Sequence, residues 1–182
     1  MQRSIILFIL IMIFSNPLLS RDLTRGDSAE SEYNYWLGLG IGGNYFGPHL
    51  CANLSFTIDE HLFTIKYGKS NEFHFAGVEN NYDDPQLEIR EYGFLYGRFH
   101  RENILLLSLS AGISYIKGIN RGKNIQYHDF EKINISTVGI PFEAEAMFEI
   151  TNYAGIGLLF YGNINKDKIY KGIMFRIKAG WF

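Results

Sequence analysis

The sequence predicts an all-β fold, an eight-stranded antiparallel up-and-down transmembrane β-barrel preceded by a signal peptide. Three observations carry this prediction: apolar residues alternate with polar or small ones, the polar positions are mostly Gly, Ser and Asn, and short turns alternate with longer polar stretches. The 182 residues, 47% of them hydrophobic, suffice for one domain. A formal net charge of −2 gives no electrostatic case for nucleic-acid binding. The single cysteine excludes an intrachain disulfide framework and a cysteine-based zinc site.

The first 20 residues have the layout of a secretory signal peptide. Arg3 precedes an apolar run from Ile5 to Phe14, which is too short to span a bilayer as a helix. We expect cleavage after Ser20, with Ser15 as the alternative site, and an uncleaved anchor or buried helix is the other interpretation. Residues 21–32 are polar and without periodicity, so we expect a short flexible tail there.

From Tyr33 onward the dominant period is two, and no window predicts an amphipathic helix. The alternation predicts eight strands, over residues 33–47, 50–58, 63–68, 87–99, 105–115, 137–148, 154–161 and 172–181. In the fourth strand we place Tyr92 outward and Glu91 inward, because a charge facing lipid costs a few kcal/mol. The glycines of the first strand alternate along it and open no helix, so they are not a nucleotide-binding loop: Gly38, Gly40, Gly42 and Gly43.

Alternation alone fits two architectures, a soluble barrel with an apolar core and a membrane barrel with an apolar exterior. Small residues at the polar positions suit a narrow lumen filled by side chains better than a surface facing water. Aromatic residues of the apolar face lie towards the strand ends, as an interfacial girdle does: Tyr35, Tyr45, Tyr67, Tyr115 and Trp181. We therefore predict a membrane barrel, and a secreted lipocalin-like soluble barrel is the alternative.

Connection lengths favour the same architecture. With the N-terminus in the periplasm, residues 59–61, 100–103 and 149–152 form short periplasmic turns. Two long polar stretches, 69–86 and 117–134, then lie outside the cell, as do two short connections that include residues 163–168. We expect the two long external loops to carry whatever surface interaction the protein has.

The signal peptide, the alternating strands and the C-terminal aromatic residues together resemble the small eight-stranded outer-membrane barrels of the OmpA/OmpX type, over about residues 33–182. The resemblance implies a place in the outer membrane of a Gram-negative bacterium, among outer-membrane lipid and lipopolysaccharide. It also implies that Phe175–Phe182 is recognised by the barrel-insertion machinery. We expect a non-enzymatic monomer without a cofactor, a metal or a nucleic-acid partner.

Six charged residues occupy inward-facing positions and form the candidate site: Lys66, Glu91, Glu143, Glu145, Arg176 and Lys178. Two of the carboxylates share one face of a strand, and two cations repeat that spacing two strands away. Because an unpaired ion in a narrow lumen is strongly destabilising, we predict that these charges pair and close the lumen. A conduction path and a binding or catalytic site are the alternatives. Cys51 also faces inward, and we interpret it as a small filler.

The enzymatic alternative is an acyl hydrolase acting on lipid A or phospholipid, because known barrels of this size include such enzymes. Its chemistry needs a serine activated by a histidine that a carboxylate orients. Two histidines lie in the external loops and three in turns that we expect to be solvated, namely His74 and His128, and His49, His61 and His100. Ser70, Glu72 and Asp129 lie near the loop histidines, but closeness in sequence does not make a triad and no hydrolase motif matches. We therefore predict no catalytic residue.

The external loops also contain acidic and aromatic residues. Glu79, Asp83 and Asp84 could hold a cation, but their segment lacks the spacing and the glycine of an EF-hand, so we expect turn chemistry. The aromatic loop residues could form an adhesive surface or a cap over the barrel mouth: Phe73, Phe75, Tyr82 and Tyr127.

Overall fold

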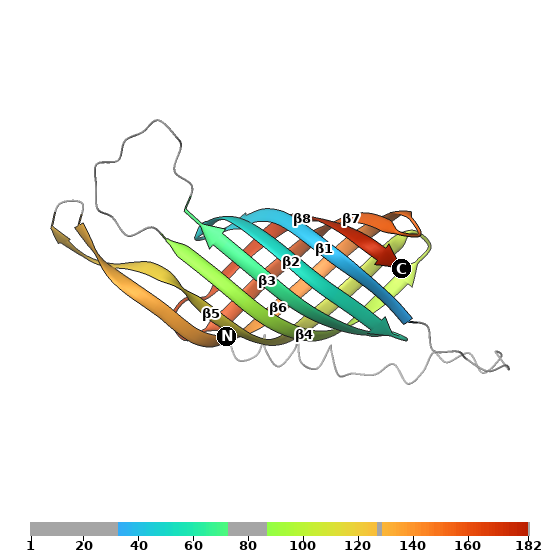
Figure 1. The fold of residues 1–182 in the computed structure, drawn as a ribbon, viewed down its shortest axis with the longest axis horizontal. Helices are drawn as coiled ribbons and strands as arrows, with labels where there is room; N and C mark the ends of the chain where they lie inside the picture. Colours follow the sequence, from blue (N-terminus) through green and yellow to red (C-terminus); the bar gives the residue numbers. More distant parts are fainter. Residues whose placement is uncertain (1–32, 73–86, 127–128, 182) are drawn as a thin grey trace, which may run out of the picture.

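The computed structural model describes residues 33–72, 87–126 and 129–181, and these residues form a closed antiparallel barrel (Figure 1). The strands are β1 (Tyr33–Asn44), β2 (Gly47–Ile58), β3 (His61–Asn71), β4 (Glu88–Glu102), β5 (Leu105–Gln126), β6 (Asp129–Thr151), β7 (Ala154–Asn165) and β8 (Tyr170–Trp181). Each strand pairs with the next, and β1 pairs with β8. The predicted all-β class and up-and-down order are confirmed. The predicted signal peptide and tail, residues 1–32, lie outside the described residues.

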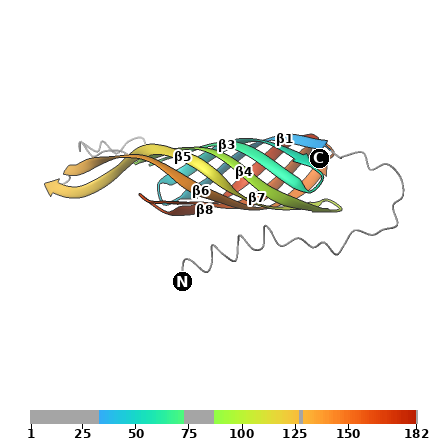
Figure 2. The same ribbon diagram turned by 90° about the horizontal axis from the view of Figure 1, so that it is seen from below.

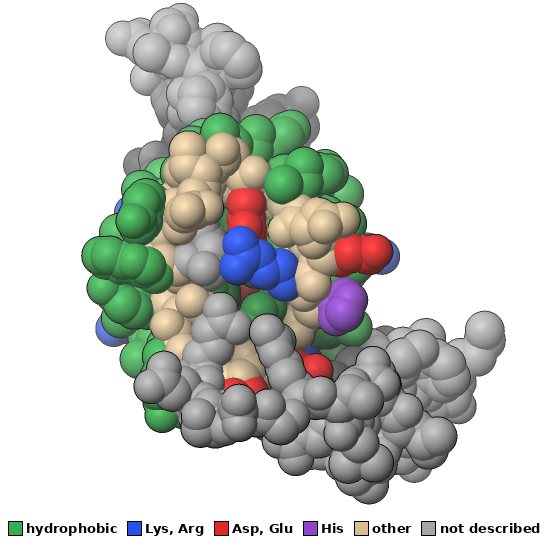
Figure 3. All heavy atoms as spheres, turned by 90° about the vertical axis from the view of Figure 1, so that its right-hand side faces the viewer, with side chains coloured by type: hydrophobic (Ala, Val, Ile, Leu, Met, Phe, Trp, Pro, Cys, Tyr) green, Lys and Arg blue, Asp and Glu red, His purple; other side chains and the backbone are tan. Residues whose placement is uncertain are grey.

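The alternation in the sequence determines which side chains face outward. Successive side chains of a strand point to opposite faces, and along β1 the residues Leu37, Leu39 and Ile41 are exposed whereas Trp36 and Gly38 are buried. Figure 3 looks along the barrel from the end at which β8 finishes, and hydrophobic side chains form much of its outer ring. Such an extensive apolar exterior favours the membrane barrel over the soluble one. Within the described ranges, no helix is long and apolar enough to cross a membrane.

The second long polar stretch, residues 117–134, is mostly a paired hairpin, so the prediction of a loop there was wrong. β5 and β6 continue to pair from Lys117 opposite Ser136 to Gln126 opposite Asp129, with two register shifts. Residues 117–119 still pair with β4 in the barrel wall. The projecting hairpin, defined here as residues 120–126 and 129–133, extends beyond the barrel mouth in both ribbon views (Figures 1 and 2). The prediction failed because this hairpin buries neither face against a core, so its sequence lacks the apolar alternation of a half-buried strand.

Several strand ends also differ from those expected. β3 continues to Asn71, so the first external stretch begins later than residue 69, and its residues 73–86 lie outside the described residues. At the opposite end of the barrel, His61 begins β3 and His100 lies within β4, and neither is a turn residue. The turns are tighter than predicted and use Asp59 and Asn103 at a φ of 55°. Asp and Asn tolerate this left-handed conformation better than most residues do.

Shortening the projecting hairpin is expected to leave the barrel intact. Arg121 and Lys132 are register partners, so residues 122–131 can be replaced by the two-residue turn Asn-Gly that closes such hairpins. A two-stranded hairpin in water is marginally stable by itself, so we expect the free energy of unfolding to change by less than about 1 kcal/mol. Urea unfolding of both barrels in lipid vesicles measures the difference. A larger loss would mean that the removed segment packs on the barrel.

Candidate functional site: the closed interior of the barrel

The six predicted inward-facing charged residues all lie inside the barrel, each 6% exposed or less. Their charges alternate in sign along one chain of contacts: Glu91, Lys66, Glu143, Arg176, Glu145 and Lys178. The five successive nitrogen–oxygen distances along this chain are 3.3, 3.1, 3.4, 3.6 and 2.5 Å. Three carboxylates face three cations, so the chain carries no net charge. We call this set the interior charge chain.

Glycines on the neighbouring strands give the two cations of β8 room to lean across the wall. Arg176 lies between Gly40 of β1 and Gly157 of β7, and Lys178 lies likewise between Gly38 and Gly155. Without side chains on β7 at these two positions, both cations reach past it to the carboxylates of β6. The alternating glycines of β1, which predicted a crowded lumen, thus stand directly beside the buried cations.

Both ends of the interior charge chain are bound by other residues. The carboxylate of Glu91 accepts hydrogen bonds from Asn163 Nδ2 at 2.8 Å and from the Tyr170 hydroxyl at 2.9 Å. The Lys178 ammonium lies 4.8 Å from the ring centre of Trp36, within range of a cation–π interaction. Sequence reasoning missed all three partners, and it placed Asn163 in an external connection although β7 continues through it. An inward-facing position on a strand was the available signal for each.

Between the interior charge chain and the hairpin end of the barrel lies a buried apolar cluster. It comprises Phe46, Cys51, Ile89, Ile116, Ile135, Leu159, Tyr161, Tyr170 and Met174. Phe46 comes from the turn between β1 and β2 and is folded inward, where its ring packs edge-on against Tyr170 at 5.9 Å. Cys51 is a buried free cysteine whose Sγ lies 3.8 Å from Arg176 Nη2. The described interior therefore combines a neutralised polar layer with an apolar one.

His49 is buried, so its predicted place in a solvated turn was wrong. β2 begins at Gly47, and His49 is therefore an inward-facing strand residue that is 2% exposed. Its Nδ1 lies 2.7 Å from the hydroxyl of Ser70, and its ring stacks on Tyr161 with centroids 4.7 Å apart. Gly47-Pro48 suggested a turn, but Pro is tolerated at the start of a strand.

The contact between His49 and Ser70 lacks the features of a hydrolase site. Within the described part of the chain, His49 hydrogen-bonds with Ser70 and Asn44 and with no carboxylate. Ser70 is fully buried, so its hydroxyl is not open to a substrate. The predicted candidates His74 and His128 lie outside the described residues, and Glu72 binds Arg121. No group of metal-binding side chains occurs in the described ranges, and Glu79, Asp83 and Asp84 lie outside them.

The predicted girdle residues lie on the outer face near both ends of the barrel, and all five are exposed: Tyr35, Tyr45, Tyr67, Tyr115 and Trp181. Tyr35 and Trp181 pack with ring centroids 5.4 Å apart, and Tyr153 packs on the same Trp181. Towards the hairpin end, Tyr92 stands between Tyr67 and Tyr115 in register and joins them in one row. Tyr92 faces outward as the alternation predicts, and it is a further member of the girdle besides the five predicted residues.

Sequence comparison finds no matching protein-family model and no matching curated protein. Solved structures match most of the chain. The N-terminal β-barrel domain of Pseudomonas aeruginosa OprF aligns with a TM-score of 0.59 at 9% identity, over 84% of this chain and 100% of that one. Ail, the attachment invasion locus protein of Yersinia pestis, aligns with a TM-score of 0.55 at 12% identity, over 84% of this chain and 99% of that one. Neisserial surface protein A aligns with a TM-score of 0.54 at 8% identity, over 81% of this chain and 94% of that one.

At such low identities these matches establish the fold alone. The chain has the fold of the small eight-stranded outer-membrane β-barrels, and the predicted class is confirmed. The location of this class, the outer membrane of a Gram-negative bacterium, agrees with the apolar exterior of the barrel.

Proposed function

We propose that this protein is a non-enzymatic outer-membrane barrel with a closed interior and an external surface for interaction. The observation that carries the proposal is the interior charge chain, in which every charge has an opposite partner within 3.6 Å. A conduction path needs a continuous water-accessible passage, whereas these side chains are buried and fill the cross-section between β3, β4, β6 and β8. An eight-stranded barrel also has an interior that side chains can fill.

The orientation follows from the connections. With the N-terminus in the periplasm, the three tight turns lie on the periplasmic side and the projecting hairpin lies outside the cell, which is the usual arrangement for bacterial barrels. We include in the proposal a periplasmic tail at residues 21–32, a monomeric state, and recognition of the C-terminal strand by the insertion machinery. No nucleic acid takes part.

The external surface of the proposal consists of the projecting hairpin and the neighbouring β3–β4 connection. The guanidinium of Arg121 joins the two through a bidentate contact with Glu72, at 3.0 and 2.8 Å. A bidentate pair fixes orientation as well as distance, so the base of the hairpin is held against the end of β3. The structural neighbour from Yersinia pestis is an attachment invasion locus protein, which supports a recognition role for such a surface.

Planar-bilayer recording tests the closed interior. We expect the wild-type barrel to show no steady single-channel current. Changing Glu143 and Arg176 together to alanine removes two large side chains and keeps the interior neutral, so we expect this variant to conduct measurably. Leu37→Ala, on the lipid-facing side of β1, is the matched control and should stay silent. A large, steady current through the wild-type barrel would overturn the proposal.

A further inference from the structure

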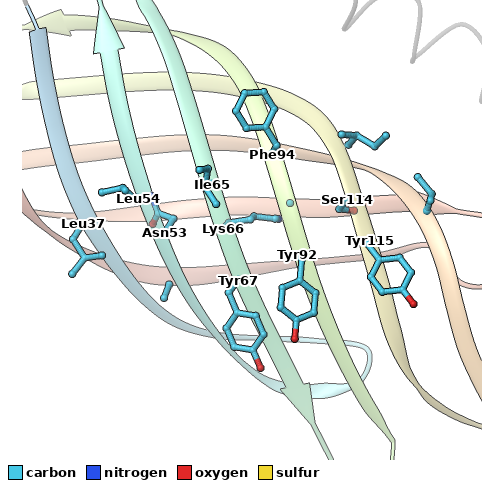
Figure 4. Close-up of a pocket in the computed structure, with 14 residues that line it drawn as sticks. Leu37, Asn53, Leu54, Ile65, Lys66, Tyr67, Tyr92, Phe94, Ser114 and Tyr115 are labelled. Carbon is cyan, nitrogen blue, oxygen red and sulfur yellow. The ribbon is translucent and has the colours of Figure 1, made fainter.

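A groove of about 670 Å³ lies along the barrel wall from β1 to β6. Most of the residues that line it face outward, and the inward-facing Asn53, Lys66 and Ser114 form its floor. Its outward-facing lining is apolar and aromatic, and includes Ala52, Ile65, Phe94 and Ile113. Figure 4 shows the rings of Tyr67, Tyr92 and Tyr115 side by side, with their hydroxyls pointing towards the end at which β3 finishes. The tyrosine row thus borders the groove on the side of the hairpin.

A row of cations runs parallel to the tyrosine row, two residues closer to the hairpin end. Lys69, Arg90 and Lys117 are direct register neighbours on β3, β4 and β5. The period of two places them on the same outer face as the tyrosines. Adjacent strands lie about 4.8 Å apart, so the three cations span about 10 Å of the wall. Among the residues that the structure describes, one carboxylate pairs with them: Glu88 lies 3.7 Å from Lys69 and 2.5 Å from Arg90. Counted over the described residues, the row has three cations against one carboxylate.

These layers match the layers of one leaflet. Tyrosine lies at the boundary between hydrocarbon and headgroups, and Lys and Arg extend to the headgroups beyond it. Cations at that height attract anionic headgroups, and the apolar groove below them can receive an acyl chain. The geometry therefore fits a lipid that combines an acyl chain with negative charge at the headgroup, in the leaflet nearer the projecting hairpin.

We propose that this outer face is a binding site for lipopolysaccharide, with the phosphates of lipid A on the row Lys69, Arg90 and Lys117 and an acyl chain in the groove. The identity of the lipid rests on the proposed orientation, since the hairpin side is then the outer leaflet. The charge complementarity does not depend on a closed interior. A conducting wild-type barrel would therefore overturn the proposed function and leave this site unaffected.

Lipid binding to the barrel, purified in detergent and freed of lipid, tests the site by native mass spectrometry. The variant R90Q/K117Q removes two of the three cations. We expect it to bind bisphosphorylated lipid A about tenfold or more weakly than the wild type, and to bind dephosphorylated lipid A as the wild type does. Ala52→Phe fills the groove and keeps the cations, so it should weaken the binding of both forms.

The matched control is K166Q/K171Q, which removes the same charge near the same end of the barrel, in the β7–β8 connection and on β8, where both lysines are exposed. We expect it to bind lipid A as the wild type does. If both double variants bound lipid A equally weakly, net charge alone would explain the loss of affinity, and the proposed site would be wrong. Unchanged binding by R90Q/K117Q would also overturn it. A preference for phosphatidylglycerol over lipid A would overturn the assignment to the outer leaflet, and with it the proposed orientation.

Discussion

Replacing Glu143 with glutamine is expected to lower the free energy of unfolding by about 3–5 kcal/mol. The Glu143 carboxylate lies between Lys66 Nζ at 3.1 Å and Arg176 Nη1 at 3.4 Å. Without its charge, the interior charge chain holds three cations against two carboxylates. The expected loss of stability comes from one positive charge that is left buried without a counter-charge. The neutral glutamine amide cannot compensate that charge.

Adding Arg176→Met to Glu143→Gln is expected to recover part of this loss. The double variant is again neutral, because Lys66 retains Glu91 at 3.3 Å and Lys178 retains Glu145 at 2.5 Å. We therefore expect the double variant to cost less than either single change, which is the signature of two residues that interact directly. Additive effects would show that these side chains do not interact.

Urea unfolding in lipid vesicles measures both variants, followed by heat-modifiable migration on gels and by tryptophan fluorescence. Glu60→Gln is the matched control. Its carboxylate also contacts an arginine, Arg98 at 3.5 Å, but is 71% exposed. Exposed pairs contribute between about 0 and 1 kcal/mol, so the same chemical change should have little effect there. A comparable loss for both variants would mean that burial does not set the cost.

The period of two made most of this architecture predictable. It placed every member of the interior charge chain at an inward-facing position, because a shift by one residue would have turned Glu91 and Glu143 towards lipid. The same constraint predicted that the carboxylates of β6 would face the cations of β8. It did not predict that Lys66 would lie between Glu91 and Glu143, since alternation fixes the face of a residue and not its height across the lumen.

Where no apolar face constrains a strand, the sequence carried little information. The projecting hairpin pairs through backbone hydrogen bonds beyond the barrel, so its side chains do not need to alternate. At His49 the alternation was informative but was not followed. His49 continues the inward-facing positions of β2, yet Gly47-Pro48 was interpreted as a turn. In both cases, pairing with a neighbouring strand makes the strand longer than its own residues predict: β2 begins earlier, and β5 and β6 continue into the hairpin.

Leu39→Arg is expected to be the second most damaging change, with a loss of about 2–4 kcal/mol in lipid vesicles. Leu39 is 58% exposed, yet it stands in the middle of β1, between the aromatic residues Tyr35 and Tyr45 that mark the two interfaces. An arginine there would place its charge near the bilayer midplane. In a soluble barrel the same exposed position would accept arginine at little cost, so the variant separates the two architectures directly.

Ile133→Arg is the matched control for this prediction. Ile133 is also exposed, but it pairs with Asn120 within the projecting hairpin, beyond the barrel mouth. The energetic penalty of a charge on a barrel falls to about 0–1 kcal/mol near the interfaces, and a residue beyond them should pay none. In urea unfolding, Leu39→Arg should therefore lower the free energy of unfolding by at least about 1 kcal/mol more than Ile133→Arg does. Equal losses would place Leu39 outside the hydrocarbon layer, or the hairpin inside it, and either result would contradict the membrane position derived from the aromatic girdle.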